Sequence, residues 1–394
     1  FSCNKSFPFR FRRLNVNCGM KKLLTCLLLG FTYSIFGQSA IAPKYVNEFL
    51  NIGAGARGYA LSGAIVSSTH DAYSGFWNPA GLARMEQKQS IGLMHAEYFA
   101  GLAKLDFASY AQKIDEQQTF GASILRFGVD NIPNTIDLYD PSGNVDYSRI
   151  SYFSTADYGF IFSYAHQDLP KKLKDKFSNS KVHHQWGANA KVIYRHIGSF
   201  AQSWGFGLDV GYQGQYEKWS WGLVGKDITG TFNAWSYQLD AKTQSVFLNT
   251  GNSLPTNNWE IALPRFTLGG GRSFNWKKYT FLLEANAVIS TDGRRNTWVS
   301  SNRFSIDPGI GLEIAYQGWL KFRTGFGNVQ KNQNFSGTYT TFQPNLGLGI
   351  QLKNIEIDYA LTDIGNQSDV LYTNMFSLTY NGLLSKSQLK ERAQ

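Results

Sequence analysis

The chain has little cysteine, and none after residue 26. Its 3 cysteines are Cys3, Cys18 and Cys26. Disulfide frameworks and thiolate metal sites both need cysteine side chains at suitable spacing. From residue 27 onward the sequence therefore excludes a disulfide-stapled fold and a cysteine-ligated metal centre.

Long apolar runs are also missing after residue 37. A helix that crosses a bilayer needs about 18 or more consecutive apolar residues, and no such run follows. Strands of a membrane barrel escape a hydropathy search, because only every second residue faces lipid. The sequence excludes a membrane-spanning helix here and leaves a membrane barrel open.

Recognisable catalytic motifs are absent as well. We find no GxSxG elbow, no HExxH pair and no phosphate-binding loop. The only adjacent histidines are His183 and His184, and neighbouring residues of a strand point to opposite faces. We therefore expect no catalytic residue, no metal site and no cofactor, and we interpret the protein as a non-enzyme.

The first 37 residues have the pattern of an upstream extension and a secretory signal peptide. Met20 is the expected true start, Lys21 and Lys22 form a basic region, the apolar stretch 23–29 follows, and cleavage is expected near Gly37. Residues 1–37 carry six basic residues and no acid, so removing them lowers the formal net charge from +10 to +4. The basic balance thus belongs largely to the leader, and we expect no nucleic-acid partner.

In the rest of the chain, apolar residues alternate with small or charged residues. Trp204, Phe206, Leu208, Val210 and Tyr212 alternate with Gly and Asp, and residues 345–352 repeat the pattern. Period-two alternation is typical of strands with one apolar face. Aromatics make up 15% of the residues and often stand at the ends of such stripes, as the interfacial girdles of membrane barrels do.

The pattern predicts an all-β fold, a transmembrane antiparallel β-barrel of about 14 strands over residues 87–381. The expected strands are 87–96, 103–114, 117–128, 151–167, 182–197, 203–214, 217–226, 261–275, 277–291, 303–316, 318–328, 339–352, 354–363 and 370–381. Connections of a few residues mostly alternate with longer ones such as 129–150, 227–260 and 329–338. Short periplasmic turns and long outer loops are the rule in outer-membrane barrels. Residues 382–394 would then be a periplasmic tail; a soluble periplasmic β-protein is the alternative.

Residues 38–86 do not fit the strand pattern. The stretch Gly53 to Met85 is rich in small residues and too irregular for one helix or strand, which suggests a plug folded inside the barrel. The segments GAGARG (53–58), GAIVSSTHDA (63–72) and FWNPAGL (76–82) resemble the N-terminus of the PorV/PorQ family. This is an outer-membrane group of Bacteroidetes, related in fold to FadL-type fatty-acid channels.

The resemblance implies a monomeric, non-enzymatic barrel in the bacterial outer membrane, surrounded by lipid. For the PorV branch it implies a role in type IX secretion, as an accessory of the translocon or a receiver of secreted cargo proteins. The residues expected to form a structural and possibly gating plug are Gly53, Gly55, Arg57, Gly63, Asp71, Trp77, Asn78, Pro79 and Gly81. Glycines permit tight turns and close approach to the wall, and a buried charge needs a partner. Arg57 and Asp71 are therefore expected to pair with lumen charges such as Glu284, Glu313, Lys321 or Arg323.

Two functions of different kinds remain open from the sequence. In the first, the barrel binds protein at its rim, and the long outer loop supplies the surface; its candidate residues are Phe232, Trp235, Tyr237, Phe247 and Trp259. Self-packing of these aromatics into a loop cap is the alternative for that loop. In the second, the barrel is a FadL-like transporter of a hydrophobic small molecule. The lumen positions are mostly Gly, Asn, Asp, Glu, Lys and Arg, which favours the first.

Overall fold

The computed structural model of the chain describes residues 45–140, 142–167, 182–255, 259–334, 337–362 and 373–382. The expected signal peptide, its cleavage site and the expected periplasmic tail beyond residue 382 lie outside the described residues. Within the described part, none of the helices has the length and apolar character needed to traverse a bilayer.

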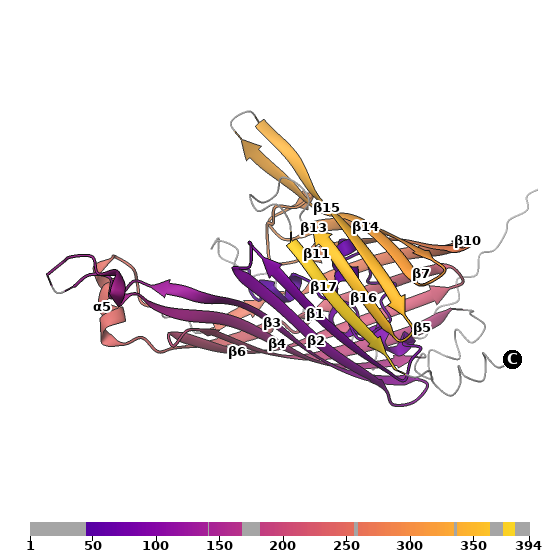
Figure 1. Ribbon diagram of the computed structural model, residues 1–394, viewed down its shortest axis with the longest axis horizontal. Helices are drawn as coiled ribbons and strands as arrows, with labels where there is room; N and C mark the ends of the chain where they lie inside the picture. The colour runs from indigo at the N-terminus through magenta and orange to yellow at the C-terminus, as the bar shows by residue number, and fades with distance from the viewer. Residues whose placement is uncertain are drawn as a thin grey trace, which may run out of the picture. The chain divides into compact units, whose positions relative to one another are not determined.

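A closed antiparallel ring of strands forms the body of the structure (Figure 1). Among the described residues, 14 strands make up this ring. They are β1 Gln89–Tyr98, β2 Ala103–Lys113, β3 Gln118–Asn134, β4 Ser151–Gln167, β5 His183–Ile197, β6 Ala201–Tyr216, β7 Trp219–Lys226, β10 Arg265–Trp276, β11 Tyr279–Ser290, β13 Ser305–Tyr316, β14 Leu320–Asn334, β15 Gly337–Leu352, β16 Ile355–Thr362 and β17 Thr373–Asn381. β1 pairs with β17, with Leu93 opposite Leu378, and this pairing closes the ring. The barrel predicted from the alternation is confirmed, and each expected strand has its counterpart.

The two faces of the wall follow the predicted alternation. On β6, Phe206 is 62% exposed on the outer side, whereas Asp209 is 3% exposed on the inner side. Aromatic pairs stand near both ends of the outer stripe: the ring centroids of Trp186 and Tyr212 are 4.6 Å apart, and those of Tyr194 and Trp204 are 4.7 Å apart. The apolar residues therefore face outward, and small or charged residues line the lumen.

The long connection 227–260 is more regular than the predicted loop. It contains β8 Thr231–Tyr237, α5 Ala241–Asn249 and β9 Trp259–Ala262. We call the end of the barrel where the long connections lie its outer end. β8 pairs with the outer end of β6, which reaches beyond the part paired with β7 and so offers a free strand edge. β9 pairs with β8 in turn. We call the outer ends of β3, β4 and β6, together with β8, β9 and α5, the wing (Figure 1).

The prediction of a loop over residues 329–338 is also wrong, because most of these residues form paired strands. β14 and β15 continue to pair beyond the ring, from Gln330 opposite Thr341 to Asn334 opposite Gly337, after a register shift between Gly327 and Gln330. Another outer connection, between β11 and β13, carries the two-residue strand β12 Val299–Ser300, and the β3–β4 connection carries the short helix η3 Tyr147–Arg149. Backbone pairing, which local composition does not report, extends these strands.

Residues 45–88 run inside the ring and are called the inner segment below. They form the short helices η1 Glu48–Asn51, α2 Ala56–Ala60, α3 Ser74–Trp77 and η2 Pro79–Arg84. Their apolar side chains pack against inward residues of the wall, and one buried cluster joins Phe76 and Ala60 to Leu125, Ile193 and Met375. The core of the protein thus lies between the inner segment and the inner face of the barrel.

Candidate functional site in the lumen

The Asn78–Gly81 turn fixes the inner segment to one side of the wall. Asn78 caps η2 by accepting a hydrogen bond from the Ala80 amide at 3.2 Å. Its side-chain amide donates to the Val66 carbonyl at 2.9 Å and to the Tyr212 carbonyl of β6 at 3.1 Å. Pro79 begins η2, where its missing N–H costs nothing. One asparagine therefore ends α3, starts η2 and bonds to the barrel.

Wall glycines make room for this turn. A Cβ added to Gly187 of β5 would stand 2.3 Å from the Pro79 carbonyl carbon, and one added to Gly211 of β6 would stand 2.2 Å from the Asn78 Oδ1. Gly81 is as tightly enclosed, because its Cβ would meet the Thr69 carbonyl oxygen at 2.4 Å. The glycines that give the strands their small-residue face are thus the surface on which the inner segment lies.

Three other predicted residues, Gly53, Gly55 and Gly63, have φ of +130°, +78° and +73°. This is the region that glycine adopts without strain. Trp77 packs beside Gly58 and donates its indole N–H to the Ala54 carbonyl at 2.6 Å. Together these residues fold the inner segment back on itself.

Arg57 joins the inner segment to a different part of the wall. Its Nε lies 2.9 Å from Glu313 Oε2 on β13, and its Nη2 lies 3.3 Å from Ser68 Oγ. Burial lowers the pKa of Arg57, but the Glu313 carboxylate more than offsets this and leaves the pKa above its ordinary value. The guanidinium therefore stays charged, and the pairing predicted for Arg57 is present.

Beneath Arg57, wall charges form a buried network around Arg323. The Arg323 side chain is 0% exposed and reaches Glu313 at 2.6 Å, Asp358 at 2.6 Å and Glu356 at 2.9 Å. Lys321 also pairs with Glu356, at 2.5 Å. Each buried charge has a partner of opposite sign, as burial of charge requires.

Other wall groups bind the backbone of the inner segment. Glu284 Oε1 accepts a hydrogen bond from the Ser67 amide at 2.6 Å, and the Asn286 amide donates to the Gly63 carbonyl at 2.9 Å. The pairing predicted for Asp71 is not seen among the described residues. Asp71 Oδ1 instead accepts from the Tyr73 amide at 2.9 Å, because a carboxylate two residues earlier is placed to cap that turn.

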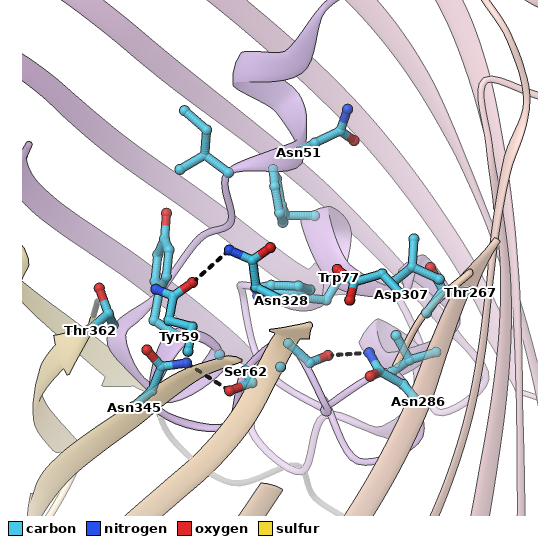
Figure 2. Close-up of a pocket in the computed structure, with 18 of the residues that line it drawn as sticks. Asn51, Tyr59, Ser62, Trp77, Thr267, Asn286, Asp307, Asn328, Asn345 and Thr362 are labelled. Atoms are coloured by element: carbon cyan, nitrogen blue, oxygen red, sulfur yellow. Dashed lines mark hydrogen bonds between the residues drawn. The ribbon is translucent and has the colours of Figure 1, made fainter. Parts of the chain in front are cut away.

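A cavity of about 530 Å³ lies between the inner segment and the wall (Figure 2). Asn51, Tyr59 and Trp77 line it from the inner segment, and Asn286 and Asp307 line it from the wall, as does Asn345. Several of its lining residues stand at the strand ends that lead into the outer connections: Tyr98, Lys226, Arg265, Gln330, Thr362 and Thr373. The cavity therefore occupies the half of the lumen that faces these connections. The sequence did not identify the wall residues of this cavity, although the alternation along the strands already indicated that they face the lumen.

The five aromatics of the 227–260 region do not share one surface. Phe232 and Trp259 are 47% and 69% exposed on the outer face of β8 and β9. Trp235 stacks on Tyr237 with centroids 6.3 Å apart, and the Arg195 guanidinium lies 5.1 Å from the centre of the Trp235 ring. Phe247 lies on α5. Part of the set therefore packs on the chain itself, and part faces outward.

The comparisons with known proteins agree with this architecture. Residues 38–217 match the family model described as "Type IX secretion system protein PorV". Over this stretch, which is less than half of the chain, the sequence is similar to the PorV family. The match covers the inner segment and the ring strands β1 to β6, including the Asn78–Gly81 turn and the two wall glycines that receive it.

Solved structures with similar folds include two described as toluene transporters. The toluene transporter TbuX of Ralstonia pickettii superposes with a TM-score of 0.50 at 15% identity, covering 84% of this chain and 99% of that one. The toluene transporter TodX of P. putida gives a TM-score of 0.50 at 13% identity, covering 84% and 99%. At such identities the likeness concerns the fold alone. A search of curated protein sequences finds no match.

No group of three or more potential metal-binding side chains occurs within the part of the chain that the structure describes. The lumen offers instead fixed ion pairs, amide groups and aromatic rings. This arrangement can hold a peptide segment or a ligand in place.

Proposed function

We propose that this chain is a member of the PorV family, a non-enzymatic outer-membrane barrel that serves type IX protein secretion by binding protein at its outer rim. The observation that carries the proposal is the PorV match over residues 38–217. The partner would be a component of the translocon or a secreted cargo protein, and the inner segment would act as a fixed plug.

The geometry of the lumen supports a plug that stays in place. Arg57, Asn78 and the Ser67 amide bond to β13, β6 and β11, which are spread around the ring. Moving the segment out would break all of these contacts together. Passage of a solute through the centre would need that movement, whereas binding of a protein outside would not.

The wing supports binding at the rim. Trp259 is 69% exposed, and Tyr152 on the outer end of β4 is 66% exposed. Aromatic side chains are enriched in protein interfaces because they bury a large area with few rotatable bonds. We infer that the outward aromatics of the wing form the contact surface.

A FadL-like transporter of a hydrophobic small molecule is the second candidate. The fold shared with the toluene transporters favours it. The lining combines apolar residues such as Val66, Phe76 and Val288 with the charged residues Lys226, Arg265 and Asp307, and the charged groups count against a purely apolar ligand. Apolar ligands are held in sites that are mostly apolar.

A pull-down distinguishes the two functions. Tagged protein is isolated from its native outer membrane in mild detergent, and the eluate is analysed for proteins and bound small molecules by mass spectrometry. Trp259→Ala is compared with Trp298→Ala, which removes an indole that is 58% exposed in a different outer connection. We expect a translocon barrel or a secreted protein with wild type and with Trp298→Ala, and a reduced yield with Trp259→Ala. An eluate free of partner protein but carrying an apolar molecule contradicts the secretion role and favours transport.

A further inference from the structure

The lumen cavity contains polar groups that the protein itself does not satisfy. Asn345 is 5% exposed; its Nδ2 donates to Ser62 Oγ at 2.7 Å, whereas its Oδ1 has no partner among the described residues. Asp307 Oδ1 is also buried without a partner there. Both residues line the cavity (Figure 2). Two acceptors therefore stand ready for donors from an occupant.

A cation stands on another part of the same cavity. The Lys226 ammonium, at the outer end of β7, has neither a hydrogen bond nor an ion pair within the described part of the chain, and it lies 4.3 Å from the centre of the Phe76 ring. This ammonium can donate hydrogen bonds to a ligand. The cavity thus offers a strong donor as well as two acceptors.

Aromatic and amide groups complete the lining. The hydroxyl of Tyr98 donates a hydrogen bond of 3.0 Å to the hydroxyl of Tyr59, and Trp77 lines the same cavity. Along the wall, Gln330 donates to Asn328 at 2.8 Å and Asn328 donates to Gln343 at 3.0 Å. Carboxamides both donate and accept hydrogen bonds. Such a lining matches a ligand that carries hydroxyl groups on a ring with C–H faces.

We propose that this cavity binds a saccharide, a neutral polyhydroxylated ring, on the outer side of the inner segment. Ligand hydroxyls donate to Asn345 Oδ1 and Asp307 Oδ1 and accept from Lys226 Nζ, while the C–H faces lie against Tyr59 and Trp77. A volume of about 530 Å³ falls within the range of roughly 300–1,000 Å³ typical of small-molecule sites. A purely apolar ligand would leave all three polar groups unmet. The site goes beyond the proposed role in secretion and stands independently of it.

Isothermal titration calorimetry of the full chain tests the site. The protein is kept in lauryldimethylamine oxide, because maltoside and glucoside detergents carry sugar headgroups. Glucose, galactose, N-acetylglucosamine and maltose are titrated separately, and toluene is titrated as the apolar probe. We expect saturable binding of at least one sugar and none of toluene.

Variants locate the binding in the cavity. Lys226→Met and Asp307→Asn each remove one charged hydrogen-bonding group, so we expect each to weaken sugar binding by about tenfold or more. Lys278→Met, in the exposed turn between β10 and β11, is the control and should bind as wild type. Heat-modifiable migration on gels reports whether each barrel is folded. The proposal is overturned if no sugar binds to folded wild type, if folded Lys226→Met and Asp307→Asn bind as well as wild type, or if toluene binds in place of sugar.

Discussion

The ion pair between Arg57 and Glu313 can be removed with little disturbance to the wall. In Arg57→Met the side chain keeps a similar length but loses its charge. Glu313 would not be left as an isolated buried charge, because Arg323 remains 2.6 Å away. The substitution therefore tests how firmly the inner segment is held, and the ring itself should still form.

The cost of the substitution follows from the geometry. Arg57 loses a charged hydrogen bond of 2.9 Å to Glu313 and a weaker one of 3.3 Å to Ser68. Hydrogen bonds to charged groups contribute about 1.5–3 kcal/mol, and the side chains of this pair are each 15% exposed, so we take about 2 kcal/mol. This lies below the roughly 3–5 kcal/mol expected when a buried charge is stranded. Opening of the inner segment should become about 30-fold more frequent.

Thiol labelling measures this opening. Ala64, which is 0% exposed in the inner segment, is replaced by cysteine in a background without the three native cysteines. Maleimide reacts only when the segment opens, so the labelling rate follows the opening equilibrium when reclosing is fast. We expect Arg57→Met to raise the rate about 30-fold. Arg303→Met, in an exposed outer connection, should leave it unchanged.

A rise of less than about threefold in Arg57→Met corresponds to under 1 kcal/mol and would refute the reasoning. In that case the Asn78 turn and the wall glycines alone would hold the segment. A rise of similar size in Arg303→Met would show that the labelling reports general loosening of the barrel.

Two further substitutions test local packing. Gly187→Ala should destabilise the inner segment by about 1–3 kcal/mol, because the added Cβ would stand 2.3 Å from the Pro79 carbonyl carbon. Gly270→Ala should be nearly neutral, because its Cβ would meet nothing closer than 3.9 Å. The same labelling assay compares the two variants, and equal labelling rates would contradict the close fit. Asp240→Ala should fray α5, because Asp240 accepts the first-turn N–H of Thr243 at 2.7 Å, and faster proteolysis of the wing is the readout. This backbone hydrogen bond lowers the pKa of the Asp240 carboxyl. The stability that the cap gives α5 is therefore present above the ordinary pKa of about 3.9, and it is lost as the pH falls through the lowered pKa of the folded state. A cleavage rate that stays unchanged across that range of pH would count against the cap.

The sequence predicted the ring well because strand alternation is a local property. Each residue of a barrel strand faces either lipid or lumen, so the chain must repeat that choice every second position. Phe206 and Asp209 show the result on one strand, at 62% and 3% exposure. Short turns were found close to the expected places: the expected turn at 215–216 lies at 217–218, and the one expected at 353 spans 353–354.

The sequence failed where pairing continues beyond the closed ring. Residues 329–338 and 231–237 are polar or mixed and read as loops, yet both extend the sheet. Their strand character comes from a neighbouring edge, namely β15 for one and the long β6 for the other. Composition alone does not report such an edge, since strand propensity depends strongly on what lies beside the strand.

The sequence by itself determined the strand pattern and the direction of each face. Only the tertiary structure decided which lumen groups meet. Arg57 and Glu313 are 256 residues apart, and Asn78 and Tyr212 are 134 residues apart. Their contacts depend on the closure of β1 on β17 and on the register of every strand between, because a shift of one residue would turn each lumen side chain outward. The cavity with Lys226, Asp307 and Asn345 is likewise assembled from separate strands, so it exists only once the ring has closed around the inner segment.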